Sequence, residues 1–176
     1  SVTFLPGEAQ EARVSAARAV RQLGFEPMPH FSARRILSED DFEGYLKAVV
    51  DEAGVSRCFI VAGDPPEPQG PYFDTSALIS TGAFERAGIK AIGVGGHPEG
   101  HPNMTTEQCW RVLDQKITDI EARGMASLIV TQFSFDPDAV LAWLKELRER
   151  GIDAPVRIGI PGPASIKSLL RFAARC

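Results

Sequence analysis

Cysteine is scarce in this sequence: its 176 residues include three, Cys58, Cys109 and Cys176, and no two of them form a C-x-x-C pair. An odd number without paired spacing argues against a disulfide scaffold. Cys58 lies within the apolar run CFIVAG, so we interpret it as a small core residue. This cysteine usage favours a reducing compartment, and we expect a cytoplasmic protein.

Long apolar runs and an excess of positive charge are also absent. No run approaches the roughly 20 apolar residues of a membrane span. The formal net charge is −4, and basic residues such as Arg34 and Arg35 are scattered along the chain. Electrostatics therefore gives no case for binding nucleic acid or an anionic membrane. The sequence also lacks a G-x-G-x-x-G pattern after its first apolar run and a Walker A pattern, so the ordinary dinucleotide and triphosphate cradles are missing.

What the sequence does contain is a regular alternation of two patterns, in a chain that is 44% hydrophobic and 24% charged. Near-continuous apolar, β-branched runs are typical of strands buried on both faces of a parallel sheet. Six such runs occur, at residues 2–5, 26–31, 57–63, 90–96, 127–133 and 156–162. Amphipathic helical patterns follow them, over residues 8–23, 38–54, 75–87, 106–123, 136–150 and 164–175.

This alternation predicts an α/β fold of six strand-plus-helix units. It is the rhythm of right-handed βαβ units, and both a doubly wound sheet and a (β/α)8 barrel fit it. A full barrel typically needs about 250 residues. Ser38 and Asp136 are expected to cap two of the helices, and the second of these helices has Pro137 at its first position.

Chemistry-bearing residues gather where the predicted strands end. All three histidines lie at such positions: His30, and then His97 and His101 in the segment HPEGHP. In both candidate architectures, active sites form at the carboxyl ends of parallel strands. The pattern therefore predicts a functional cleft built from several strand ends.

Two kinds of cleft are compatible with these residues. His30, His97 and His101, with Glu99, are typical ligands of a metal-dependent barrel hydrolase. However, two prolines and a glycine break the HPEGHP segment, so the helical geometry of an H-E-x-x-H site is absent. The alternative is an organic ligand, for which the proline-rich loop after Asp64 provides a stiff wall. In that case Gln132 offers an amide for a heterocycle edge, and Phe133 or Phe135 offers a stacking face or fills the core.

Five segments in order carry a resemblance to a known family. They are PMPHFSARR (27–35), AGDPP (62–66), HPEGHP (97–102), VTQFSFD (130–136) and IPGPASIKSLLRFA (160–173), with SVTF (1–4) ahead of them. Together they resemble methylenetetrahydrofolate reductase over nearly the whole chain. The resemblance implies a TIM (β/α)8 barrel, of which residues 1–176 would form a single catalytic domain of about six βα units. It also implies flavin-dependent reduction of 5,10-methylenetetrahydrofolate to 5-methyltetrahydrofolate, with FAD as cofactor and a reductant such as NAD(P)H.

The resemblance also assigns roles residue by residue. The cofactor-binding residues would be Thr3, His30, Gly63, Asp64, His97, His101 and Lys116. Asp64 would also be catalytic, because its charge favours the cationic iminium that forms before hydride transfer. Gln132 and Phe135 would bind the folate. Glu99 would hold its loop rather than bind a metal, and no metal site is expected.

The sequence departs from the family pattern at a few points. Ala62 stands where the family has arginine, and Gln115 where a second basic residue is usual. The alignment lacks the first and eighth barrel strands, so we expect an internal portion of a longer enzyme whose proton donor lies outside this chain. A non-catalytic folate- or flavin-binding relative is the alternative reading within the same family, and self-association is a further expectation because homo-oligomers are common.

Overall fold

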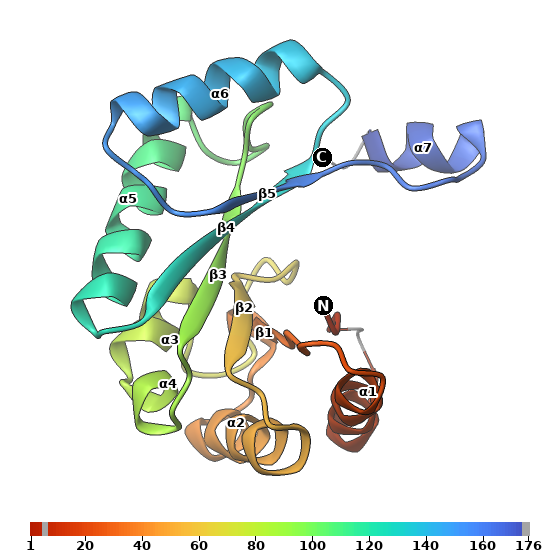
Figure 1. Cartoon of the computed structure of the whole chain (residues 1–176), viewed down its shortest axis with the longest axis vertical. Coiled ribbons are helices and arrows are strands. Elements are labelled where there is room, and N and C mark those ends of the chain that lie inside the picture. Colours follow the sequence, from red (N-terminus) through yellow and green to blue (C-terminus); the bar gives the residue numbers. More distant parts are fainter. Residues whose placement is uncertain (5–6, 174–176) are drawn as a thin grey trace. The chain divides into compact units, whose positions relative to one another are not determined.

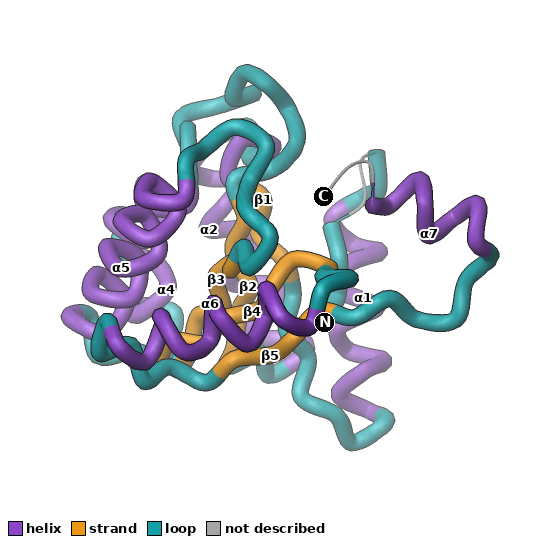
Figure 2. Tube along the Cα trace, turned by 90° about the horizontal axis from the view of Figure 1, so that it is seen from above, coloured by secondary structure: helices purple, strands orange, loops and turns teal. Residues whose placement is uncertain are grey.

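The computed structural model of the protein describes residues 1–4 and 7–173, and the order of its elements can be followed in Figure 1. The strands in this part of the chain are β1 (His30–Ser32), β2 (Arg57–Val61), β3 (Ala91–Gly96), β4 (Ala126–Phe133) and β5 (Val156–Gly159). The helices are α1 (Gln10–Gln22), η1 (Ala33–Arg35), α2 (Glu39–Ala53), α3 (Thr75–Ser80), α4 (Ala83–Arg86), α5 (Thr106–Ala122), α6 (Pro137–Glu149) and α7 (Ile166–Ala173). Helices alternate with strands along the chain, as Figure 2 also shows.

The strands form one sheet in the order β1-β2-β3-β4-β5. The pairs β1–β2, β2–β3 and β4–β5 are parallel, with His30 opposite Phe59 and Cys58 opposite Ile92 in the first two. Successive parallel neighbours joined through helices define an α/β fold. The predicted alternation is therefore confirmed.

The prediction of a full strand at residues 2–5 is wrong, because the described residues of this segment form only a single bridge. In the described part of this segment, Val2 forms an isolated parallel bridge with Pro29. Two hydrogen bonds make it, from Val2 N to Met28 O and from His30 N to Val2 O, each 2.9 Å long. Pro27 and Pro29 have no amide hydrogen, which limits what this edge can donate to a longer ladder. Residues 5 and 6 lie outside the described part.

Two compact units divide the chain. The first holds residues 1–93 and 118–127. Its core is aromatic: Phe31 packs edge to face on Phe42 and Phe84, and Tyr72 packs on Phe42. Helix α1 packs against α2. The Ser38 hydroxyl caps α2 by accepting a hydrogen bond from Asp41 N, as predicted, and Gly54 ends the helix in the left-handed region.

The second unit holds residues 94–117 and those from 128 onward. Trp110 of α5 stacks on Trp143 of α6, with ring centroids 5.3 Å apart and planes 13° apart. The Asp136 carboxylate caps α6 through Asp138 N and Ala139 N, with proline next at the first helical position. The predicted start of this helix is confirmed.

The expected helix over residues 75–87 is instead two short helices, α3 and α4. The Thr81 hydroxyl donates to Leu78 O at 2.7 Å and accepts from Ala83 N at 3.2 Å, so it takes over backbone bonds at the break. Gly82 has φ 73°, a left-handed conformation that interrupts the helix. Across residues 1–4 and 7–173, no helix has the length and apolar character needed to cross a membrane.

Candidate functional site

His30 is the first residue of β1 in the first unit, so its predicted position at the end of a strand is wrong, and the side chain is mostly buried. Its ring lies against Phe59 of β2, with centroids 4.8 Å apart and planes tilted by 56°. Burial lowers the pKa of His30 to about 4, so the imidazole is neutral near pH 7. Thr3, on the segment that bridges to β1, is exposed.

Gly63 and Asp64 follow β2. Gly63 has φ 97°, and a Cβ added there would lie 2.2 Å from Ser32 Oγ at the end of β1. The Asp64 side chain is 96% exposed, and its Oδ2 lies 3.8 Å from Arg35 Nη2. The backbone at Gly63 is therefore held tightly, whereas the carboxylate beside it is surrounded by solvent and faces one cation.

The proline-rich loop after Asp64 is held by Arg34, a residue to which the sequence reasoning gave no role. Arg34 Nε donates to Phe73 O at 2.9 Å, and Nη1 donates to Pro65 O at 3.2 Å. The amide of Gln69 returns a bond to Arg34 O at 2.8 Å. These contacts support the prediction that the loop keeps a fixed shape.

His97 and His101 lie together in the second unit. Their ring centroids are 4.9 Å apart, edge to face. Burial, followed by the charges of His101 and Lys116, lowers the pKa of His97 to about 4. Burial and then Lys116 also lower the pKa of His101. Asn103 N donates to His101 Nδ1 at 3.1 Å, so the neutral ring carries its proton on Nε2.

Glu99 joins the histidine loop to the end of β4. Its Oε1 accepts hydrogen bonds from Phe135 N at 2.7 Å, from Asp136 N at 3.0 Å and from the Ser134 hydroxyl. These bonds favour the charged carboxylate, and they lower the pKa of Glu99. The contacts agree with the prediction that Glu99 holds the loop, and they identify Ser134 as a partner that the sequence reasoning missed.

Gln132 and Phe135 stand at the end of β4 and beyond it. Gln132 is exposed, and its side-chain carbonyl accepts from Phe133 N at 3.3 Å. Phe133 and Phe135 are 41% and 44% exposed, so neither is a core residue. They line a small apolar pocket of about 50 Å³ together with residues 161, 162, 164 and 169. An aromatic surface is therefore available at this strand end.

The predicted residues thus fall into two groups. The first unit contains Thr3, His30, Gly63 and Asp64, and the second contains His97, His101, Lys116, Gln132 and Phe135. Within residues 1–4 and 7–173, histidine, cysteine, aspartate and glutamate side chains form no group of three or more that could hold a metal ion.

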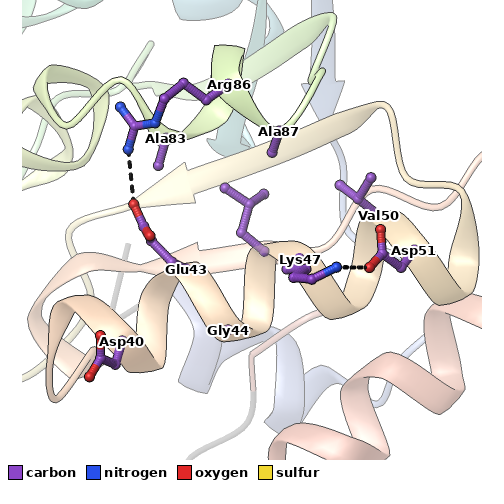
Figure 3. Close-up of a pocket in the computed structure, with 10 residues that line it drawn as sticks. Asp40, Glu43, Gly44, Lys47, Val50, Asp51, Ala83, Arg86 and Ala87 are labelled. Carbon is purple, nitrogen blue, oxygen red and sulfur yellow. Dashed lines mark hydrogen bonds and ion pairs between the residues drawn. The ribbon is translucent and has the colours of Figure 1, made fainter.

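A larger pocket, of about 580 Å³, lies between α2 and α4 (Figure 3). Apolar side chains such as Leu46, Val50 and Ala83 line it, and charged pairs flank it. Arg86 Nη2 donates to Glu43 at 2.9 Å, and Lys47 pairs with Asp51 on the same helix. None of the predicted site residues is among its lining residues, so it gives no support to the strand-end site.

The fold and these residues define an α/β protein with a neutral histidine at the start of β1 and two more in the loop after β3. A family model described as methylenetetrahydrofolate reductase matches residues 1–176. The chain belongs to the methylenetetrahydrofolate reductase family, a family of oxidoreductases.

Curated relatives agree with this assignment. Methylenetetrahydrofolate reductase 2 of Saccharomyces cerevisiae is 28% identical over 172 residues, which cover 92% of this chain and 27% of the relative. Methylenetetrahydrofolate reductase (NADH) 1 of Arabidopsis thaliana is 26% identical over 135 residues, covering 70% of this chain and 23% of the relative. The chain spans about a quarter of the length of these proteins.

Proposed function

We propose that this chain takes part in the flavin-dependent reduction of 5,10-methylenetetrahydrofolate to 5-methyltetrahydrofolate, on a fold of the (β/α)8 barrel type. The observation that carries the proposal is the pair His97 and His101, held by Glu99 within a family match over the whole chain. Bound FAD would supply hydride chemistry, taking hydride from a nicotinamide such as NAD(P)H and delivering it to the folate.

The chemistry of the donor set fits FAD. Burial keeps His30 and His97 neutral near pH 7, and neutral imidazoles hydrogen-bond an uncharged heterocycle without adding charge. Lys116 supplies positive charge beside His97 and His101, as its effect on the pKa of both shows. That charge suits the phosphates of a dinucleotide. Thr3 and the backbone at Gly63 would complete the cofactor-binding residues.

The folate would contact the remaining residues. The negative carboxylate of Asp64 would stabilise positive charge that develops on the one-carbon unit. Arg35, 3.8 Å away, would orient this carboxylate, but its own positive charge would cancel part of the stabilisation. The amide of Gln132 can donate and accept at once, which matches the edge of a pterin. Phe135, with much of its ring exposed, would provide a stacking face.

The test of the cofactor step is a titration of this chain with FAD, read by the quenching of flavin fluorescence and by flavin retained after desalting. Lys116→Met should weaken FAD binding at least about tenfold, because a hydrogen bond to a charged group is worth roughly 1.5 to 3 kcal/mol. Lys145→Met is the matched control, because Lys145 is an exposed lysine of α6. Absence of FAD binding to the unaltered chain would contradict the cofactor assignment.

A second measurement tests the substrate. The FAD-loaded chain is reduced under anaerobic conditions and mixed with 5,10-methylenetetrahydrofolate, and return of the oxidised flavin spectrum is followed. Since the proton donor is expected outside residues 1–176, we expect slow reoxidation. At equal flavin occupancy, Asp64→Asn should slow it roughly a further tenfold. Flavin binding without folate-driven reoxidation would instead favour a non-catalytic binding relative.

A further inference from the structure

Arg13 of α1 is a buried cation in the first unit. It is 9% exposed, and its guanidinium carbon lies 4.4 Å from the ring centroid of Phe4 and 4.3 Å from that of Tyr45. These rings cover the faces of the guanidinium, so its in-plane N–H groups must find acceptors elsewhere. Among residues 1–4 and 7–173, neither Arg13 Nε nor the Tyr45 hydroxyl has a hydrogen-bond partner.

Both side chains line a cavity of about 270 Å³ between α1, α2 and the end of β1. Phe31 and Ser32, which follow His30 along β1, are also in its wall. The cavity is lined by none of the residues to which the family resemblance gives a role.

Four charged side chains in the wall limit what the cavity can accept. Arg13 and Arg35 are opposed by Glu8 and Asp41, so their formal charges cancel. The Asp41 carboxylate is already engaged by Leu37 N at 3.2 Å. A divalent phosphate would meet two carboxylates, whereas a single carboxylate can pair with a guanidinium and keep its charge away from them.

Much of the remaining wall is apolar and aromatic, with Phe4, Phe31 and Phe42 in it, and Gln10, Ser32 and Gln69 add uncharged polar groups. Burial raises the pKa of Tyr45 to about 12, so its hydroxyl remains a donor at neutral pH. A volume slightly below the usual range of ligand pockets, which begins at about 300 Å³, suits a small molecule. An aromatic or aliphatic body would replace water along the wall, and an anionic group would satisfy the buried donors.

We propose that this cavity is a binding site for a small monocarboxylate with an apolar body, whose carboxylate pairs with Arg13 and accepts from Tyr45. The site does not depend on FAD or folate, so it stands or falls apart from the proposed reductase function. The buried guanidinium without a partner at Nε is the observation that favours a ligand over a purely structural arginine, because unpaired buried polar groups are costly.

The test is isothermal titration calorimetry of the chain with phenylacetate. Phenylacetamide has the same shape without the charge, and inorganic phosphate has charge without the apolar body. We expect phenylacetate to bind at one site, with phenylacetamide and phosphate at least about tenfold weaker. Absence of phenylacetate binding, or tighter binding of phosphate, would overturn the proposal.

Two variants locate the site. Arg13→Met keeps an unbranched side chain between the rings and should weaken phenylacetate binding at least about tenfold. Arg18→Met is the control, because Arg18 lies on the same helix and forms an exposed pair with Glu52. Tyr45→Phe removes the hydroxyl alone and should weaken binding severalfold, which keeps the test decisive if Arg13→Met does not fold. Wild-type affinity in Tyr45→Phe and in a folded Arg13→Met would place the ligand elsewhere.

Discussion

The two units keep a histidine neutral at neutral pH in different surroundings. His30 in the first unit and His97 in the second both have a pKa of about 4, in each case chiefly through burial. His30 rests on one aromatic ring, and the nearby Asp64 is almost fully exposed. His97 has a second imidazole beside it, in a loop held by Glu99. In the first unit the Gly63 backbone sets the turn after β2 and Arg34 holds the loop beyond it. In the second unit, hydrogen bonds to the Glu99 carboxylate hold the histidine loop.

The chain offers separate probes for the two regions. Both tryptophans, Trp110 and Trp143, lie in the second unit, and both tyrosines, Tyr45 and Tyr72, lie in the first. Unfolding followed by tryptophan fluorescence therefore reports the second unit, and tyrosine absorbance reports the first. Variants at the two strand ends can be compared without assuming that the chain unfolds in one step.

The largest effect is expected for Gly63→Ala. Alanine at φ 97° is strained, and its Cβ would approach Ser32 Oγ to 2.2 Å, so the serine or the backbone has to move. We expect the free energy of unfolding reported by tyrosine to fall by about 3 kcal/mol, the sum of a left-handed conformation and a steric overlap.

A matched control for this substitution exists in the second unit. Gly100 has φ 94°, and an added Cβ would meet no heavy atom within 4 Å. Gly100→Ala should therefore lower stability by the conformational part alone, about 1 kcal/mol. Adding Ser32→Ala to Gly63→Ala should recover part of the loss. Equal costs at the two glycines would show that the first strand end is no more constrained by packing than the second.

The next effect concerns pH. An unfolded histidine titrates near pH 6.5, whereas His30 and His97 titrate near pH 4 when folded. Between these values the unfolded chain binds more protons, so stability is complete above about pH 6.5 and falls as the pH is lowered toward 4. After allowance for solvent screening, each histidine should account for about 1 kcal/mol between about pH 7.5 and pH 5.

Single variants assign this loss to the two regions. Denaturant unfolding is measured at both pH values. In His30→Gln, the free energy of unfolding reported by tyrosine absorbance should depend less on pH than in the unaltered chain. In His97→Gln, the same should hold for the value reported by tryptophan fluorescence. His101→Gln should change the pH dependence less than His97→Gln, because the His101 imidazole is less deeply buried than that of His97. An unchanged pH dependence in both main variants would contradict the burial of these imidazoles.

The sequence allowed much of this architecture to be predicted, because local signals and burial agree there. Ser38, Gly54 and Asp136 mark helix ends through their own side chains or backbone freedom, and the structure places them as predicted. Gly82, by contrast, split an expected helix, because a left-handed glycine and a helical glycine look alike in a sequence. The apolar run at residues 2–5 suggested a strand, but pairing depends on the neighbouring edge, which contains Pro29.

Long-range contacts were the part that could not be predicted. Arg13 sits beside Val14 on α1, and an arginine is ordinarily expected at the surface, yet it is buried against Phe4 and Tyr45. Leu23, the last residue of the helical pattern predicted over residues 8–23, is exposed, since the helix ends at Gln22. The contact of Glu99 with the end of β4 spans more than thirty positions, and only the type of residue hinted at it.

The smallest effect is expected at Glu99, and it separates charge from hydrogen bonding. Glu99→Ala removes the acceptor shared by Ser134, Phe135 and Asp136, and should lower the stability reported by tryptophan by about 1 kcal/mol, a value reduced because the site is exposed. Glu99→Gln keeps a carbonyl acceptor and loses the charge, so it should cost about half as much. Glu149→Ala, at an exposed position on α6, is the control. If Glu99→Ala matched this control, side-chain hydrogen bonds would not hold the histidine loop, and the contrast between the two strand ends would rest on the glycine alone.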